Sequence, residues 1–306
     1  MTQAEASSTF NKFRKVIGLG NILLAGLFRF ARKQIESVVL GGWPVLRWKI
    51  GTLLAIPWAI SAVVVVRLLR PLVLIRFGPL VSDRIGHFTL NGEIYLCQRD
   101  LGMHRRRTVD ITYNLPRVCN QYLKKQWDQK LNVRGWAKYL DRANGILPGG
   151  GKHLWPIPHY ILDDSPFSRT PAHLSFTPEE EQRGRQALKD MGVPVDAPFV
   201  CFHNRDSSYL DSVTEKPGLH SANDYRDCHI GNYLQAAEEL TLRGYYAVRT
   251  GSVVDEPLDT ANTMIIDYAT LARTDFMDIY LGAKCSFFLG CNSGIIWVPK
   301  IFRRPV

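Results

Sequence analysis

The amino-acid sequence predicts an α/β fold built from two parallel sheets with helices on both faces. Short apolar segments typical of buried strands alternate with helical segments, and this succession occurs twice along the chain. A third observation separates the start of the chain from the rest. Residues 1–76 hold 11 basic and two acidic side chains, whereas residues 77–306 hold 27 and 26. The formal charge of +10 therefore belongs almost entirely to the first quarter of the 306-residue chain.

This distribution of charge bears on the partners of the protein. A nearly neutral body argues against nucleic-acid binding, because nucleic-acid-binding domains normally carry a basic face of their own. The basic and apolar start of the chain favours an anionic membrane surface instead. We therefore expect a membrane partner and no nucleic acid.

Two segments near the start have the composition of membrane helices. Residues 50–66 carry no charge and, as a helix rising ~1.5 Å per residue, would extend about 25 Å, the short limit for crossing a bilayer. Residues 10–30 mix basic and apolar side chains, as do helices that lie in the membrane interface. We expect residues 1–70 to be membrane-associated and helical. Whether residues 50–66 span the bilayer, lie on it or form a buried helix of the fold stays open.

The first half of the body, residues 71–165, contains two predicted strands. Residues 72–78 form an apolar run that ends in glycine, as buried parallel strands do, and residues 109–113 form the second strand. A helix is expected after His87 and through Cys97, and a second helix over residues 115–130. Residues 144–159 are rich in glycine and proline and predict a loop. It is not a phosphate loop, because no apolar strand precedes its three glycines.

The second half, residues 166–306, follows a linker at residues 163–171. Thr177, Pro178 and Glu180 have the spacing of an N-cap, a first-turn proline and a capping box, and they predict a helix that ends near residue 191. The other elements expected here are strands at 199–203, 245–250, 264–268 and 286–289, a helix over 230–244, and a helix capped by Thr274. The chain ends where the pattern predicts a further strand and closing helices, so we expect the protein to be longer.

Ligands of parallel α/β sheets bind beyond the carboxyl ends of the strands. Three polar segments occupy such positions, namely His203-Asn204-Arg205-Asp206, Arg249-Thr250-Gly251 and Asn292-Ser293-Gly294. Arg205 could clamp a diphosphate, and Asp206 could orient Arg205 or a sugar hydroxyl. Alternatively, Arg205 and Asp206 could form a solvated ion pair on the loop. Thr250 and Gly251 could approach a phosphate or form a plain turn. The helix start at Ser293 could hold an anion or only cap the helix.

Other residues offer less specific signals. Asp83 or His87, after the first strand, could act as a general base on an acceptor hydroxyl, or Asp83 could be a solvated loop residue. Asp227 could cap the helix that follows it or order the loop with Arg226. The six cysteines show neither a CxxC pair nor a His/Cys metal spacing, so we expect reduced, mostly buried thiols. Walker A, GxSxG, HExxH and GxGxxG motifs do not occur.

A family resemblance rests on the end of the chain. The segment TDFMDIYLGAKCSFFLGCNSGIIWVPKIFRRPV, residues 274–306, resembles the donor-site end of glycosyltransferases with the GT-B fold, in particular the heptosyltransferase type. Together with FHNRDSSYL (202–210), DYRD…NY (224–233) and RTG (249–251), it resembles a bacterial family of little-characterised glycosyltransferases. The resemblance covers roughly residues 70–306 and is weaker over the first half.

The resemblance implies two Rossmann-like domains, residues 71–165 for the acceptor and residues 166–306 for the donor nucleotide. It implies donor contacts from the three polar segments described above. It also places Asp83 in the loop that holds the catalytic base of heptosyltransferase-like enzymes, although the surrounding SDRIGH differs from theirs. GT-B enzymes generally need no metal, so neither a metal nor a cofactor other than the nucleotide-sugar substrate is expected.

These observations lead to one hypothesis and two alternatives. The hypothesis is an inverting, metal-independent glycosyltransferase at the cytoplasmic face of the bacterial inner membrane. It would transfer a sugar from a nucleotide-sugar to a cell-surface polysaccharide or a lipid-linked glycan precursor. One alternative is a non-catalytic nucleotide-binding or scaffold protein of a glycan assembly complex. The other is a different group transferase on the same scaffold, such as a pyruvyl transferase.

Overall fold

The computed structural model describes residues 32–306 except 34, 44, 48, 49, 52, 53, 105, 106, 157–164, 214–220 and 272. The interfacial helix predicted for residues 10–30 lies outside the described residues. The chain divides into two units: the described part of residues 1–63 is helical, and residues 64–306 contain every described strand. Among the helices of the described part, none combines the length and the apolar character that crossing a membrane requires.

The body contains six strands and a larger set of helices in its described residues. The strands are β1 (Leu74–Leu80), β2 (Thr108–Asn114), β3 (Phe199–His203), β4 (Tyr246–Arg249), β5 (Ile265–Ile266) and β6 (Phe288–Gly290). The helices are α2 (Ile85–Asp100), α3 (Gln121–Lys130), α4 (Ala137–Ile146), α5 (Ser165–Arg169), α6 (Pro178–Asp190), α7 (Ser208–Val213), α8 (Leu234–Leu242), α9 (Tyr268–Leu271), α10 (Asp275–Lys284) and α11 (Trp297–Ile301). Short 3₁₀ turns cover Gly150–His153, Ser221–Arg226, Ile230–Tyr233 and Gly294–Ile296. Each of the six predicted strands is present.

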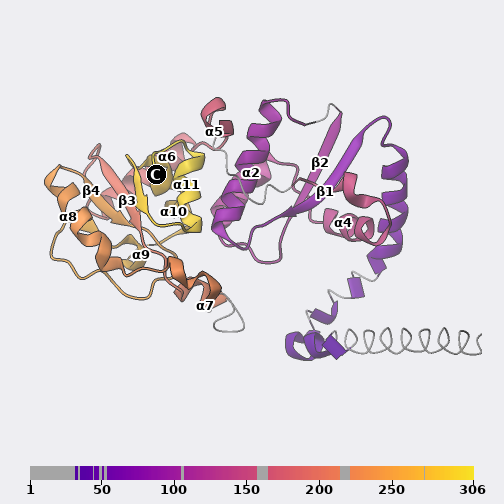
Figure 1. The fold of residues 1–306 in the computed structure, drawn as a ribbon, viewed down its shortest axis with the longest axis horizontal. Helices are drawn as coiled ribbons and strands as arrows, with labels where there is room; N and C mark the ends of the chain where they lie inside the picture. Colours follow the sequence, from indigo (N-terminus) through magenta and orange to yellow (C-terminus); the bar gives the residue numbers. More distant parts are fainter. Residues whose placement is uncertain are drawn as a thin grey trace, which may run out of the picture. The chain divides into compact units, whose positions relative to one another are not determined.

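The first sheet is parallel and small. β1 pairs with β2 along seven residues each, and single parallel bridges add Leu154 beside Phe77 of β1 and Val133 beside Thr112 of β2. The resulting order is Val133, β2, β1, Leu154. In Figure 1, α2 is drawn on one side of β1 and β2 and α4 on the other. α2 is buried continuously from Phe88 to Cys97, as expected of a helix that is enclosed on all sides.

A buried ion pair joins the two strands of the first sheet. Arg76 of β1 lies directly opposite Asp110 of β2 in the parallel register. Its Nε and Nη2 donate to the two carboxylate oxygens of Asp110 at 2.6 and 2.7 Å, and both side chains are largely buried. The Tyr95 hydroxyl on α2 donates to the same carboxylate at 2.8 Å. Asp110 therefore joins the two strands through Arg76 and anchors α2 to the sheet through Tyr95.

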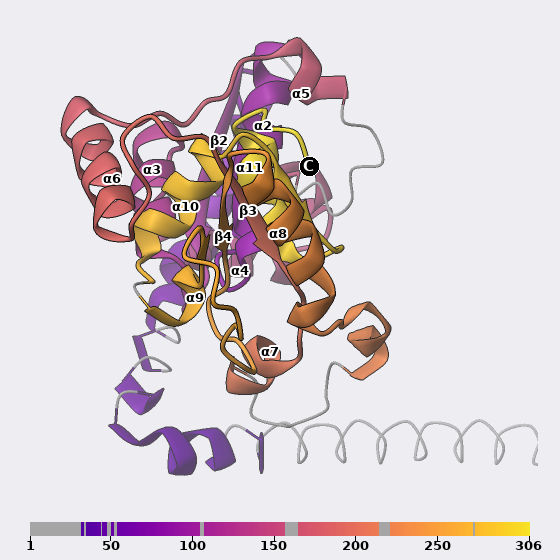
Figure 2. The same cartoon turned by 90° about the vertical axis from the view of Figure 1, so that its left-hand side faces the viewer.

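The second sheet is also parallel, in the order β5-β4-β3-β6. Both of its faces are buried, so successive residues of β3 enter different clusters. Phe199 and Cys201 pack in the cluster that contains the apolar side of α10, and Val200 and Phe202 pack with Ala237 of α8. Figure 2 shows α8 on one side of β3 and β4 and α10 on the other. Both sheets are parallel and helices lie between most of their consecutive strands along the chain, which confirms the α/β fold class predicted from the sequence.

Helix starts that depend on neighbouring residues are as predicted. Thr177 Oγ1 accepts the Glu180 N–H at 3.2 Å, and Glu180 Oε2 accepts the Thr177 N–H at 3.1 Å, which completes the capping box of α6. Thr274 caps α10 by accepting the Met277 N–H at 3.1 Å. Because a cap involves residues at most four positions apart, local sequence is sufficient to locate it.

Several predicted boundaries are wrong. The helix expected after His87 begins already at Ile85 and ends at Asp100, and Tyr268, expected in a strand, begins α9. The helix expected over residues 115–130 begins only at Gln121, because Asn120 caps it and Ser82 binds the segment before it: Ser82 Oγ donates to the Arg117 carbonyl at 2.9 Å. The loop expected over residues 144–159 starts inside α4 and contains a 3₁₀ turn. The helix expected over residues 230–244 begins as a 3₁₀ turn and ends at Leu242.

Arg67 has a role that the sequence pattern did not predict. The sequence places it at the polar end of the uncharged stretch 50–66. In the structure its guanidinium donates to the carbonyl oxygens of Asn144 (3.0 Å), Leu147 (3.0 Å) and Pro148 (2.6 Å). Arg67 thus satisfies carbonyl groups that the C-terminus of α4 leaves without helical partners.

Half of the cysteines, rather than most of them, are buried. All six cysteines lie among the described residues and are free. Cys97, Cys201 and Cys285 are buried, and the other three are half-buried.

Candidate functional site

The strand order of the second sheet reverses between β3 and β6, the place where open α/β sheets bind their ligands. Two of the predicted donor-binding segments meet there. The Arg205 N–H, after β3, donates to Cys291 Sγ, after β6, at 3.2 Å. Asn204 Nδ2 donates to the Cys228 carbonyl at 3.0 Å, which adds the loop before α8.

The loop after β1 contacts the segments that follow β3 and β6. Gly86, in the first turn of α2, lies backbone to backbone against Gly294: a Cβ at Gly86 would stand 2.8 Å from Gly294 Cα. The Tyr209 hydroxyl, on α7, donates to the Asp83 carbonyl at 3.4 Å. His87 is half-buried in the same turn as Gly86. The segments that carry Asp83, Arg205 and Ser293 therefore contact one another, although they are far apart in sequence.

Replacing Gly86 by alanine is expected to lower the free energy of unfolding by about 1–3 kcal/mol, because the new methyl group meets backbone that cannot rotate away. Urea unfolding of wild type and variant measures this difference. Gly145→Ala is the matched control: it lies inside α4 with open space around the position, so an alanine there should leave stability unchanged or raise it. Equal stability of wild type and Gly86→Ala would contradict the close approach to Gly294.

Each of these segments contains a buried oxygen atom without a partner, as do several other places in the described part of the fold. In the described part of the chain, Asp83 Oδ1, Asn204 Oδ1 and Ser293 Oγ are buried and form no hydrogen bond. Buried polar atoms are nearly always paired, and an orphaned one costs about 1–3 kcal/mol. Each of the three segments thus contributes one atom that a ligand could hydrogen-bond.

Arg205 is held in an environment of mixed charge. It is only 8% exposed and forms an ion pair with Asp227. Burial, and next the charge of Arg226, lower the pKa of its guanidinium. Asp227, rather than Asp206, is therefore the carboxylate paired with Arg205. Asp206 binds its own loop instead, by accepting the Ser208 N–H at 3.1 Å and the Asp255 N–H at 3.3 Å.

The side chains at the end of β4 form hydrogen bonds with other residues of the protein. Arg249 is fully buried, and its Nη1 donates to the Glu256 carbonyl at 2.6 Å and lies 3.4 Å from Asp267 Oδ2. His203 Nδ1 donates to the Thr250 carbonyl at 2.8 Å, and burial lowers the pKa of this imidazole. The Thr250 hydroxyl donates to the Phe202 carbonyl at 3.3 Å. Gly251 is packed against Val254, with which a Cβ would collide at 2.7 Å. Arg249 and Thr250 thus position the loops around the site.

The strand, turn and helix predicted at the end of the chain are present, but the helix is short. A 3₁₀ turn from Gly294 to Ile296 leads into α11, which has five residues. Because a helix of five residues contributes only a small dipole, Ser293 would bind a ligand through its hydroxyl group rather than through the helix N-terminus. Asn292 lies in the same turn, between Cys291 and Ser293.

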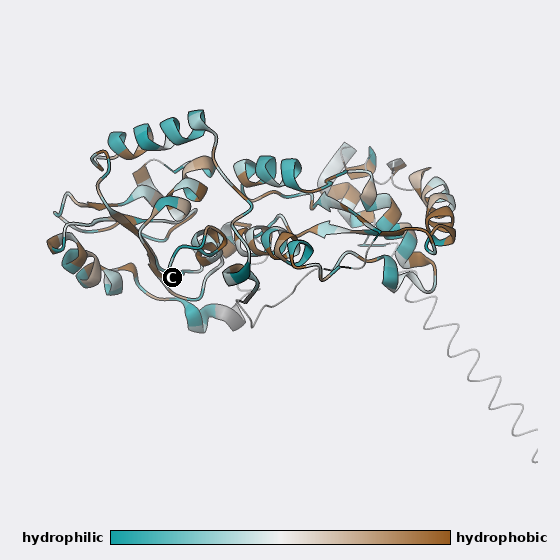
Figure 3. Cartoon of the chain, turned by 90° about the horizontal axis from the view of Figure 1, so that it is seen from above, coloured by the Kyte–Doolittle hydropathy of each residue, from teal (hydrophilic) through white to brown (hydrophobic). Residues whose placement is uncertain are grey.

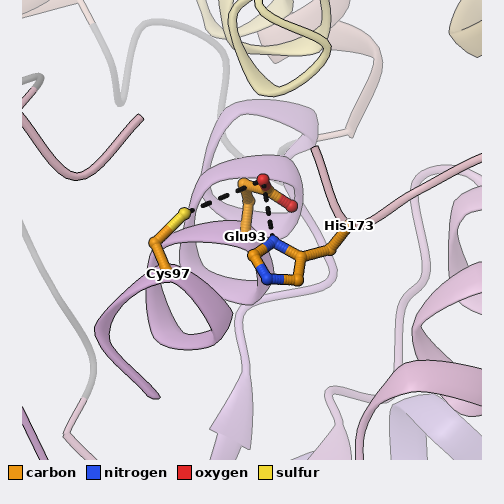
Figure 4. Close-up of side chains that lie close together, drawn as sticks. All are labelled: Glu93, Cys97 and His173. Carbon is orange, nitrogen blue, oxygen red and sulfur yellow. Dashed lines mark hydrogen bonds and ion pairs between the residues drawn. The ribbon is translucent and has the colours of Figure 1, made fainter. Parts of the chain in front are cut away.

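One group of possible metal ligands occurs among the described residues, away from this site (Figure 4). His173 Nδ1 lies 3.1 Å from Glu93 Oε1, and Cys97 Sγ lies 3.8 Å from the same oxygen. Arg303 Nη2 also contacts Glu93 Oε1, at 2.7 Å, and lies 3.6 Å from Cys97 Sγ. Asp100 Oδ2 lies 2.9 Å from His173 Nε2. Because the guanidinium stands where a cation would have to bind, the arrangement is an ion-pair cluster of two cationic and two anionic side chains.

This cluster predicts a pH dependence of stability. Hydrogen bonds to Cys97, Glu93 and Asp100 raise the pKa of His173 to about 10. The stabilisation by the imidazolium is therefore complete below about pH 6.5, the ordinary histidine pKa, and is lost as pH rises through about 10. The free energy of unfolding of wild type minus that of His173→Gln should fall by at most about 5 kcal/mol between pH 6 and 10.

Urea unfolding at a series of pH values tests this expectation. His229→Gln is the control, since it removes a histidine whose side chain is 66% exposed. A difference between wild type and His173→Gln that stays constant from pH 6 to 10 would show that His173 gains nothing from its proton.

Comparison with known proteins finds similar chains only among solved structures. The chain matches none of the protein-family models and none of the curated proteins searched. Among solved structures it is similar to the ADP-heptose lipopolysaccharide heptosyltransferase II of E. coli, at 12% identity and a TM-score of 0.41, over 76% of this chain and 83% of that one. It is also similar to TibC, an iron-containing dodecameric glycosyltransferase of enterotoxigenic E. coli H10407. There the identity is 13% and the TM-score 0.36, over 77% of this chain and 58% of that one. At these values the likenesses carry neither activity nor substrate to this chain.

Proposed function

We propose that this protein is a glycosyltransferase that moves a sugar from a nucleotide-sugar to a cell-surface polysaccharide or a lipid-linked glycan precursor. The observation that carries the proposal is the meeting of three segments at the reversal of strand order. Each of these segments brings one buried oxygen atom without a partner, on Asp83, Asn204 and Ser293. A nucleoside diphosphate with an attached sugar has the hydroxyl and phosphate groups that such atoms would bind.

Arg205 and Ser293 are assigned to the departing diphosphate. Negative charge grows on that group as the bond to the sugar breaks, so a positive side chain and a hydroxyl donor stabilise the transition state more than the ground state. Arg205 supplies the charge from a nearly buried position, where water screens it little. Asn204 Oδ1 can only accept, which suits a hydroxyl of the ribose or of the sugar.

Asp83 is assigned as the general base, with His87 one turn further as the alternative. In an inverting transfer the acceptor oxygen attacks the anomeric carbon while the bond to the diphosphate breaks. The proton of the acceptor hydroxyl passes to Asp83, and the nucleoside diphosphate leaves. The unpartnered Oδ1 of Asp83 is free to receive that proton.

Calorimetric titration of the full chain with a panel of nucleoside diphosphates, followed by turnover assays with the matching nucleotide-sugars, tests the proposal. We expect binding of at least one diphosphate and turnover of its sugar derivative in the presence of membrane glycan acceptors. Absence of binding for every nucleotide would overturn the donor site. Binding without turnover would favour the non-catalytic alternative.

A single substitution separates binding from chemistry. Asp83→Asn should leave nucleotide affinity unchanged and lower turnover at least a hundredfold, the usual contribution of a general base. Asp190→Asn is the control, because Asp190 ends α6 and lies outside the site. Full turnover by Asp83→Asn would remove Asp83 from the proposal and direct the search to His87.

A further inference from the structure

The helix of residues 54–68 exposes one mainly apolar face. Ser61 is the exposed polar residue within this face, and its hydroxyl donates to the Pro57 carbonyl at 3.2 Å. Leu54, Trp58, Val65 and Leu68 are 74%, 56%, 54% and 74% exposed. Steps of four, seven and three residues place these side chains on the same side of a helix. Figure 3 shows the helix as predominantly hydrophobic. An exposed, mainly apolar face of this kind marks a contact with a partner or with lipid.

Not all of the helix surface is exposed, since Ala59 and Val63 are 0% exposed. Arg67 is the one charged residue of the segment 54–68, and its guanidinium is bound by the carbonyl oxygens at the end of α4. The exposed face therefore carries no charge. A helix with an exposed face that is uncharged and mainly apolar fits half-immersion in a membrane interface.

The charge of the region decides between lipid and a second copy of the chain as the occupant of this face. Residues 1–70, which exclude the buried and ion-paired Arg76, carry a net formal charge of +8. Two copies joined through this face would bring two such regions together, and like charges would repel. An anionic bilayer has the opposite charge and attracts each nearby basic residue by about 1 kcal/mol. Trp58, in the exposed row, is of the residue type that concentrates at the level of the lipid headgroups.

We propose that the helix of residues 54–68 lies in the plane of an anionic membrane surface and is seated there by the face of Leu54, Trp58, Val65 and Leu68. The inference does not depend on the proposed transferase activity. If both hold, the surface keeps the enzyme beside a lipid-linked acceptor and raises the effective concentration of that acceptor.

Flotation of the full chain with phospholipid vesicles tests the surface. We expect binding to vesicles of phosphatidylcholine with phosphatidylglycerol, weaker binding at high salt, and little binding to phosphatidylcholine alone. Leu68→Asp should weaken partitioning into the anionic vesicles at least tenfold, because it removes apolar surface and adds a negative charge. The matched control is Leu242→Asp, at the end of α8, where the leucine is 83% exposed, and its binding should equal that of wild type.

Three outcomes would overturn the proposal. They are equal vesicle binding by wild type and Leu68→Asp, failure of wild type to bind anionic vesicles, and a wild-type dimer that Leu68→Asp converts to a monomer without any vesicle binding. Retention in membranes after alkaline carbonate extraction would also overturn it, since an in-plane helix should be released. Nucleotide titration of the same samples in solution is read separately, so that failure of the membrane surface and failure of the donor site are distinguishable.

Discussion

Replacing Asp110 by alanine is expected to lower the free energy of unfolding by about 3–5 kcal/mol, the usual cost of breaking a buried ion pair from one side. The substitution leaves the guanidinium of Arg76 buried in the first sheet without its bidentate partner. It also removes the acceptor of the Tyr95 hydroxyl, and with it the link between α2 and the sheet. Arg76 and Asp110 face each other across the strands, so no neighbouring carboxylate of β1 or β2 can replace the lost one.

Chemical denaturation of the purified variant measures this loss. Asp128→Ala is the control: Asp128 forms an exposed ion pair with Lys124 within one helix, so its removal should cost less than about 0.5 kcal/mol. The double variant Arg76→Met, Asp110→Leu should recover most of the stability, because it buries no unpaired charge. A single variant as stable as Asp128→Ala would mean that the pair does not hold the first sheet together.

Replacing Arg205 by alanine is expected to weaken nucleoside diphosphate binding about 10- to 150-fold, or ~1.5–3 kcal/mol, if the proposed donor site is correct. Arg205 is the nearly buried cation at the reversal of strand order, and its ion pair with Asp227 fixes its orientation. Arg205→Lys should lose part of the affinity, because an ammonium keeps the charge but not the planar fork that matches two phosphate oxygens.

Calorimetric titration compares these variants with Arg243→Ala. Arg243 is an exposed arginine at the end of α8, paired with Glu239, and its removal should leave nucleotide affinity unchanged. Since Arg205→Ala leaves Asp227 unpaired, the thermal stability of each variant is measured as well. A folded Arg205→Ala protein that binds nucleotides as tightly as wild type would refute the assignment.

Much of the fold could be predicted because it depends on near neighbours in sequence. The limits of β3 follow from five apolar or half-buried residues enclosed on both faces, and the starts of α6 and α10 follow from caps closed within three residues. The helix expected over residues 115–130 was wrong because a distant residue, Ser82, binds the segment before Asn120. Long-range hydrogen bonds of this kind leave no local pattern.

For the candidate site as well, one part could be predicted from the sequence and another part could not. The segments after β3 and β6 could be predicted, because parallel strands bring their carboxyl ends to one edge of a sheet. The pairing of Arg205 with Asp227, the inward direction of Arg249 and the meeting of Gly86 with Gly294 could not. Each depends on where a side chain or backbone points after packing. The cluster of Glu93, Cys97 and His173 was missed for the same reason, since its histidine lies far along the chain from α2.

The N-terminal quarter shows most clearly what each level determines. The sequence alone determined that residues 1–76 are basic and apolar, because charge and hydropathy are properties of the residues themselves. Only the tertiary structure decided that Arg67 turns toward the end of α4 while Leu54, Trp58, Val65 and Leu68 stay exposed. The physical reason is that carbonyl groups left open by a distant helix bind the guanidinium, and the face left to solvent is then mainly apolar.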